Sequence, residues 1–195
     1  MQWLFGMPVR VHANCHIGKY HKIEVEDDVT AYLEYANGAT GVFVTSTGEA
    51  PGTNRLEVMG TRGKVVIEGG TIKFTRNEVP FDEFCATSKA PFATPPVWHV
   101  DIPCNGDGGQ HCEIMENFVD AILDKKPLIA EARDGIRSVE LANAMLLSSF
   151  TGKTVDIPIS AAVYERRLKK LIRESTFKKE VKKTGPVGDM SASFA

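Results

Sequence analysis

The sequence is poor in cysteine, in long apolar runs and in net charge. Its four cysteines have no paired spacing, which favours a reducing compartment such as the cytoplasm over a disulfide framework. No apolar run reaches the roughly 18 residues that a membrane-spanning helix needs. Residues 1–10 lack a basic start followed by an apolar stretch, so we expect no secretory signal and no membrane partner.

The charge balance argues against a nucleic-acid-binding chain, because the formal net charge is -2 and the pI is near 6.2. Basic residues do gather between Arg166 and Lys183, with Phe177 as the one aromatic among them. We interpret this run as a solvated helix face that continues into a mobile basic tail over residues 176–195. Binding of nucleic acid or an anionic surface is the weaker alternative. Residues 1–175 then form the folded domain, and 43% hydrophobic residues suffice for its core.

The first half of the chain has the pattern of β-strands. Alternating residues lead up to Asn37-Gly38, which predicts a hairpin, and a β-branched strand returns over 39–47. Further short strands are expected at 9–15, 56–59, 65–67, 71–75 and 98–102. Such short connections make antiparallel pairs. Residues 85–97 contain Pro91, Pro95 and Pro96 and are expected to be irregular.

The second half has helical periodicity. One helix starts near His111, with its apolar face at 115, 118, 119, 122 and 123, and Pro127 ends it. A second covers about 134–149, is expected to be buried on most sides and ends at Gly152. Ser160 is expected to cap a third, whose inner stripe is Tyr164, Leu168, Leu171 and Ile172.

Strands followed by helices predict an α+β fold, with an open-faced, mostly antiparallel sheet and helices packed on one face. The open face carries Val, Phe, Tyr and Thr. We therefore expect a homo-oligomer, a dimer or tetramer, through it.

Three stretches could carry chemistry, and none forms a complete active site. Residues 106–111 superficially resemble a dinucleotide-binding turn, but His111 replaces the third glycine and a helix, not a parallel strand, follows; a linker is the better interpretation. His12, Cys15 and His16 lack the paired spacing of zinc sites, and on a strand Cys15 points away from the histidines, so half-exposed strand histidines are favoured. His111 could bind a substrate hydroxyl or relay a proton, or simply begin a helix. We predict no catalytic, cofactor-binding or metal-binding residue from these patterns.

Several stretches resemble the glucose-fructose oxidoreductase and inositol dehydrogenase (Gfo/Idh/MocA) family. Residues 26–41 look like the acidic-start hairpin of its C-terminal domain, and 53–64 are similar to the turn that follows. Three further stretches match the family in order and spacing. They are Asn-Phe-Val-Asp-Ala-Ile-Leu at 117–123, Pro-Leu at 127–128 and Ser-Val-Glu-Leu-Ala-Asn-Ala at 138–144. The likeness covers residues 2 to about 172, and 189–194 look like the tails of some bacterial members.

The resemblance implies a two-domain enzyme that transfers hydride between NAD or NADP and a sugar, polyol or similar hydroxyl compound. Its nucleotide-binding Rossmann domain carries the catalytic lysine of a Glu-Lys-Pro motif, and this chain has neither. Trp3-Leu4-Phe5-Gly6 looks like the family's Trp-Leu-x-Gly stretch, which places the family's catalytic aspartate and histidine upstream of Met1.

The chain is therefore expected to supply the substrate-binding and oligomerisation half, inactive alone, with a Rossmann domain missing or separately encoded. The substrate-binding candidates by position are His111, Thr47, Asn54 and Arg55, although Arg55 could equally be a surface or sheet-edge residue. The alternative is a stand-alone, non-enzymatic module that oligomerises or binds sugar.

Overall fold

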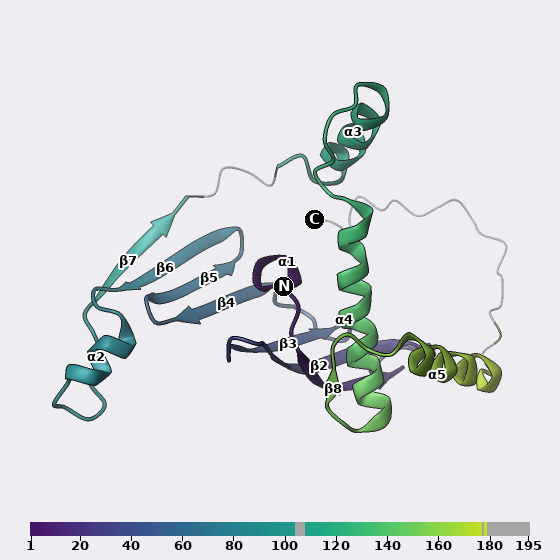
Figure 1. The fold of residues 1–195 in the computed structure, drawn as a ribbon, viewed down its shortest axis with the longest axis horizontal. Coiled ribbons are helices and arrows are strands. Elements are labelled where there is room, and N and C mark those ends of the chain that lie inside the picture. The colour runs from purple at the N-terminus through teal and green to yellow at the C-terminus, as the bar shows by residue number, and fades with distance from the viewer. Residues whose placement is uncertain (104–107, 177, 179–195) are drawn as a thin grey trace. The chain divides into compact units, whose positions relative to one another are not determined.

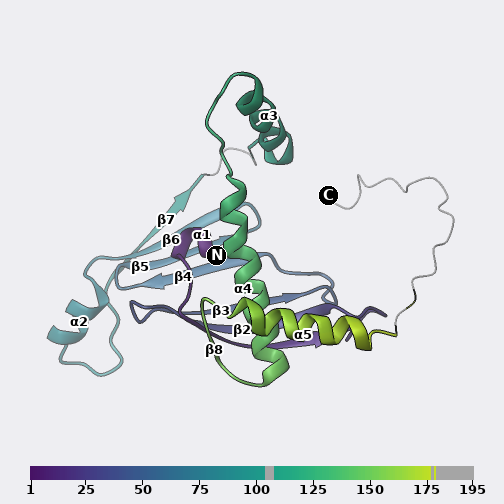
Figure 2. The same cartoon turned by 45° about the vertical axis from the view of Figure 1, so that its right-hand side comes forward.

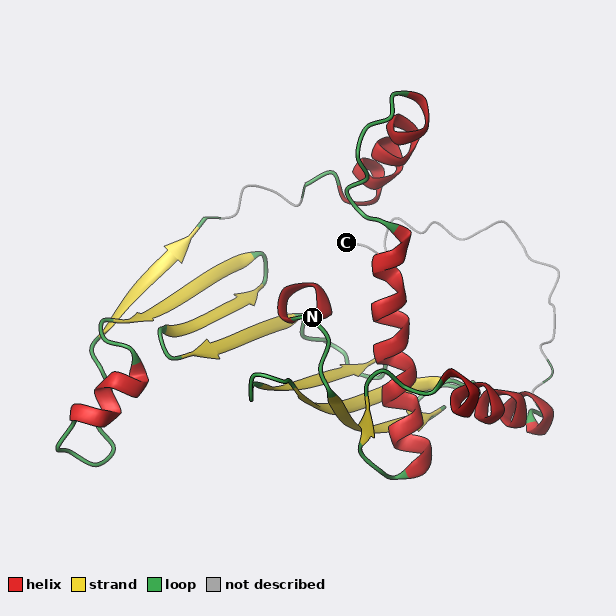
Figure 3. Ribbon diagram, in the orientation of Figure 1, coloured by secondary structure: helices red, strands yellow, loops and turns green. Residues whose placement is uncertain are grey.

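The computed structural model describes residues 1–103, 108–176 and 178 (Figure 1). The chain folds as two units, one of residues 1–48 with 131 onward, the other of residues 49–130. Figure 3 shows strands and helices in both. The predicted α+β class with antiparallel sheets is confirmed, and the strands are divided between two sheets of four. No helix among the described residues is long and apolar enough to cross a membrane.

The first unit holds an antiparallel sheet in the order β3-β2-β1-β8. Its elements are α1 (Gln2–Phe5), β1 (Arg10–Ile17), β2 (Glu26–Glu34), β3 (Thr40–Ser46), α4 (Ala132–Thr151), β8 (Val155–Asp156) and α5 (Ala161–Glu174). The predicted Asn37-Gly38 hairpin joins β2 to β3. Gly38 has φ 84°, and the Asn37 side chain accepts the amide of Ala39 at 3.0 Å. A residue with a side chain would be strained at that φ.

The core of this unit lies between one face of the sheet and α4, which crosses it in both views (Figures 1 and 2). The buried side chains are Val11, Ala13, Val29, Ala31, Leu33, Leu141, Ala144 and Met145. They alternate along β1 and β2, and on α4 they cluster on the sheet-facing side. Each large one contributes about 1.5–3 kcal/mol of burial free energy. His12 and His16 point to the opposite, solvated face, as predicted.

Two consecutive serines of α4 bind the backbone of β1. The fully buried Ser148 hydroxyl accepts the Ala13 amide at 3.0 Å and donates to the Lys153 carbonyl at 2.7 Å. Ser149 accepts the Cys15 amide at 2.9 Å. Because β1 keeps its ladder bonds to β2, these hydroxyls satisfy amides on its other edge, where β8 pairs only with Arg10 and Val11.

The second unit holds an antiparallel sheet in the order β4-β5-β6-β7. Its elements are β4 (Arg55–Gly60), β5 (Gly63–Glu68), β6 (Thr71–Asn77), α2 (Phe81–Thr87), β7 (Val97–Ile102) and α3 (Gln110–Leu123). The register aligns Leu56, Ile67, Ile72 and Ile102 in one row and Val58, Val65, Phe74 and Val100 in another. Both rows lie on one face, and none of the eight side chains is buried.

Three expectations about the helices need correction. Residues 85–97 are expected to be irregular, but helix α2 begins before them and covers the first three, residues 85–87. Pro80 precedes the helix, and Asp82 and Glu83 lie in its first turn, where the helix dipole favours acidic side chains. Helix α4 is buried only in its C-terminal half, since Ile136 and Val139 are exposed. A run of seven residues without clear periodicity, followed by prolines, explains why α2 was missed.

The predicted inner stripe of α5 is also mostly exposed. Tyr164 is half-buried, but Leu168, Leu171 and Ile172 face solvent. Ser160 stands at the N-cap position as predicted, without a side-chain cap bond. The boundary at residue 175 and the mobile tail stay predictions, because residues 177 and 179–195 lie outside the described part of the chain.

Candidate functional site

A buried carboxylate organises one end of the first unit's sheet. Asp27, the second residue of β2, is 4% exposed. Its Oδ1 accepts the Lys19 amide at 2.9 Å, and its Oδ2 accepts the amides of Tyr20 at 2.8 Å and His21 at 3.0 Å. Three successive backbone N–H groups of the β1–β2 loop thus converge on one side chain, an anion-binding arrangement that the protein fills with its own carboxylate.

The same contacts keep Asp27 ionised. Burial raises the pKa of this carboxyl, but the hydrogen bonds from Tyr20, Lys19 and His21 together outweigh burial and lower the pKa to about 2. The His21 Nδ1 also lies 3.3 Å from Oδ2. At neutral pH this end of the sheet therefore holds a fixed negative charge.

The neighbouring Asp28 points to the opposite face of the sheet. Its Oδ2 lies 2.6 Å from Lys19 Nζ and 2.8 Å from His16 Nδ1. The Lys19 hydrogen bond is the main cause that lowers the pKa of Asp28, and the same contact raises the pKa of Lys19. These groups are partly solvated, so their ion pair fixes geometry more than it stabilises the fold.

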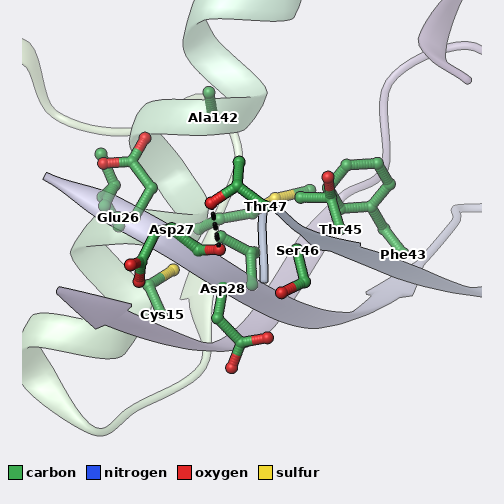
Figure 4. A pocket seen from close by; sticks show the side chains of 12 residues that line it. Cys15, Glu26, Asp27, Asp28, Phe43, Thr45, Ser46, Thr47 and Ala142 are labelled. Carbon is green, nitrogen blue, oxygen red and sulfur yellow. Dashed lines mark hydrogen bonds between the residues drawn. The ribbon is translucent and has the colours of Figure 1, made fainter. Parts of the chain in front are cut away.

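Thr47 is hydrogen-bonded to the backbone of Asp27. It follows β3, its amide donates to the Asp27 carbonyl at 3.0 Å, and its hydroxyl donates to the same carbonyl at 3.3 Å (Figure 4). The hydroxyl is also 3.3 Å from His21 Nδ1. Next to it, a Cβ at Gly48 would lie 2.3 Å from the Tyr20 ring, so only glycine lets that ring pack there. The Thr47 hydroxyl keeps acceptor capacity for a ligand.

Thr47 lines a cavity of about 290 Å³ between the ends of the strands and α4 (Figure 4). The apolar part of its wall is formed by Val29, Phe43, Ala142, Met145 and Leu146. The polar part is formed by Cys15, Thr45, Ser46, Thr47 and the acidic residues Glu26, Asp27 and Asp28, of which Asp28 turns its carboxylate to the opposite face of the sheet. Burial raises the pKa of the Cys15 thiol, which therefore stays protonated at neutral pH. Hydroxyl groups beside an apolar surface suit a small molecule with both kinds of surface.

The other three substrate-binding candidates lie in the second unit, whereas Thr47 lies in the first. Asn54 is exposed in the loop before β4. Arg55 begins β4 and is held by Glu57 and by Glu68, the latter at 2.8 Å. Its guanidinium is thus engaged in sheet-edge ion pairs. His111 is the second residue of α3 and is exposed. A substrate role for these residues stays a prediction.

The strand pairing of the described residues differs from that of a dinucleotide-binding fold. Every strand pair in both sheets is antiparallel, so the described part of the chain contains no parallel βαβ unit. Residues 106 and 107 of the glycine-rich turn lie outside it, and α3 starts at Gln110. Among the described side chains no group of three His, Cys, Asp or Glu could hold a metal ion.

Sequence reasoning singled out Thr47 but missed Asp27 and the cavity. The available signal was three consecutive carboxylates, at 26–28, at the start of a strand. Alternation predicts that one of them points into the core, but not that three amides of the preceding β1–β2 loop donate to it.

The sequence of residues 1–157 matches the C-terminal alpha/beta domain of the Gfo/Idh/MocA oxidoreductases. The chain belongs to this family. No curated protein matches the sequence. The expected family membership is thereby confirmed for most of the chain.

Solved structures of family-like oxidoreductases share the fold. The WlbA dehydrogenase from Chromobacterium violaceum, solved with NADH and UDP-GlcNAcA, is 23% identical with a TM-score of 0.61; 82% of this chain covers 43% of that one. The aldose-aldose oxidoreductase from Caulobacter crescentus, solved with glycerol, is 21% identical with a TM-score of 0.58. The match covers 80% of this chain and 43% of that one. An NAD-binding protein from Listeria innocua is 21% identical with a TM-score of 0.57, covering 80% and 44%. The chain spans less than half the length of each of these proteins.

Proposed function

We propose that this chain is the substrate-binding and oligomerisation half of an NAD(P)-dependent oxidoreductase that acts on a sugar, polyol or related hydroxyl compound. The observation that carries the proposal is the cavity beside Thr47, in a chain that belongs to an oxidoreductase family. Its hydroxyl-lined and apolar wall suits a compound with many hydroxyl groups and a carbon skeleton. WlbA with its nucleotide sugar and the aldose-aldose oxidoreductase supply the analogy for the substrate class.

In such an enzyme the nicotinamide carries the hydride, and the protein supplies binding, orientation and electrostatics. We place the cofactor and the catalytic lysine on a Rossmann domain outside residues 1–195. The chain's own contribution is to hold the substrate: Thr47 accepts from a substrate hydroxyl, and Asp27 fixes Thr47. On this proposal the chain is inactive alone. Unpaired thiols at Cys15, Cys85 and Cys112 support a reducing, cytoplasmic location.

Oligomerisation is supported by the second unit's sheet. Two rows of four apolar side chains cross all its strands on one face, and none is buried. The opposite face carries the Arg55, Glu57 and Glu68 ion pairs. A continuous apolar face of this kind is unfavourable in water, and a second copy of the chain can cover it.

Two measurements on one sample test the proposal: titration of the purified chain with NADH, followed by cofactor fluorescence, and the solution mass. We expect no NADH binding and a dimer or tetramer. Adding a Rossmann domain encoded nearby should then restore NADH-dependent reduction or oxidation of a sugar. Saturable NADH binding at micromolar concentration would contradict the assignment of the cofactor to another domain, and residues 106–111 would be mutated first. A stable oligomer that binds sugar but never gains activity would support the stand-alone module.

A further inference from the structure

Acidic residues outnumber basic residues in the wall of the cavity beside Thr47. Among the described residues that line it, three are acidic, Glu26, Asp27 and Asp28, and none is a lysine or arginine. The Asp28 carboxylate points to the opposite face of the sheet, where Lys19 binds it, so the wall takes its charge from Glu26 and Asp27. Asp27 has no such cation, because its partners are backbone amides and the His21 ring. The cavity therefore carries net negative charge at neutral pH.

This charge is fixed and close to the ligand space. Asp27 is buried and held by three amides, so it cannot turn away from an incoming anion. The remaining wall is apolar or carries neutral hydroxyl and thiol groups. An anionic ligand would lose its hydration there and gain no counter-charge, whereas neutral hydroxyl groups can donate to the carboxylates and to the threonine oxygens.

We propose that the cavity selects a neutral polyhydroxylated compound, of monosaccharide or polyol size, and rejects the same compound bearing a carboxylate. This inference rests on the proposed function and narrows its substrate class. It sets the chain apart from WlbA, whose solved complex contains the sugar acid derivative UDP-GlcNAcA.

The test uses two probes that share a ring and differ in one carboxylate: D-glucose and D-glucuronate. The full chain, labelled with 15N, is titrated with each at neutral pH, and amide shifts of Lys19–His21 and Thr45–Gly48 are followed. We expect D-glucose to bind in the millimolar range and D-glucuronate at least about tenfold more weakly, which corresponds to about 1.4 kcal/mol.

A matched pair of variants assigns the selectivity to the cavity. Glu26→Gln removes a charge from the wall, and Glu34→Gln removes one from the other end of β2, where Glu34 pairs with Arg10. Glu26→Gln should raise the affinity for D-glucuronate relative to that for D-glucose by about threefold, by the Coulomb argument. Glu34→Gln should change neither.

The outcomes separate the inference from the proposed function. Equal binding of both sugars at the cavity overturns the charge selectivity and leaves the substrate-binding role intact. Absence of shifts with D-glucose, D-glucuronate and myo-inositol, at concentrations up to tens of millimolar, overturns both. An effect of Glu34→Gln as large as that of Glu26→Gln would show long-range electrostatics rather than a selective wall.

Discussion

At the residue scale, Asp27 has the largest structural role in the candidate site. One side chain orders the loop of Lys19, Tyr20 and His21, and its own carbonyl orders Thr47. A carboxylate that accepts several amides is favoured in its charged form, so loop order depends on ionisation. The site is thus built around a residue that itself contacts mostly backbone.

Asp27→Asn should lower the urea midpoint of unfolding at pH 7, because an amide binds the three N–H groups less strongly and leaves its own NH2 without an acceptor. The folded-state pKa of about 2 lies below the ordinary 3.8, so the ionised form stabilises the fold above about pH 4. That contribution is lost as the pH falls toward 2. The difference in urea midpoint between wild type and variant should therefore shrink from pH 4 to pH 2.

The control is Asp101→Asn at an exposed position, which should differ little from wild type in urea midpoint. A difference for Asp27→Asn that stays constant with pH would contradict the role of the charge.

Thr47→Val removes the hydroxyl and keeps the shape. We expect about tenfold weaker sugar binding, since a hydrogen bond to a substrate hydroxyl is lost, and a small change in stability because the internal bond is long at 3.3 Å. Isothermal titration or NMR measures the affinity. The control is Thr30→Val on the opposite face of β2, which should bind as the wild type does. Unchanged binding by Thr47→Val would remove Thr47 from the site.

At the element scale, α4 joins helix and sheet through both apolar and polar contacts. Its C-terminal half buries Leu141, Ala144 and Met145 against β1 and β2, and Ser148 with Ser149 bonds the β1 backbone. The position of β1 sets where the β1–β2 loop begins, and the amides of that loop donate to Asp27. The helix therefore supports the site in two ways, because it positions β1 and also forms part of the cavity wall.

Ser148→Ala should destabilise the chain by about 1–3 kcal/mol, because the amide of Ala13 and the carbonyl of Lys153 would lose a buried partner. Ser149→Ala is the comparison, with a smaller loss, since Ser149 is only half-buried and water can replace its hydroxyl. Urea unfolding followed by circular dichroism measures both. Equal losses would mean that burial does not distinguish the two serines.

At the scale of the whole molecule, the second unit's sheet carries two rows of apolar side chains on one face, none of them buried. Val65→Lys places a charge in the middle of that face, and Val66→Lys places the same charge on the other face of the same strand. We expect Val65→Lys to dissociate the proposed oligomer and Val66→Lys to leave it assembled. Light scattering after size-exclusion chromatography measures the mass. Assembly that survives Val65→Lys would place the interface elsewhere.

The sequence by itself determined the α+β class, the Asn37-Gly38 hairpin and the family, because these follow from local periodicity, turn chemistry and short motifs. The expected order of strands before helices is only approximate, since α2 precedes β7 and β8 follows α4. It located Thr47 only by resemblance, and it missed α2, whose seven residues show too little periodicity. Only the tertiary structure decided which carboxylate of 26–28 is buried, that loop amides converge on it, and that a cavity lies beside Thr47. The cavity joins residues far apart in the chain, whose proximity is fixed by strand register and by the packing of α4. The amides on Asp27 belong to the neighbouring loop, whose conformation no periodic pattern specifies.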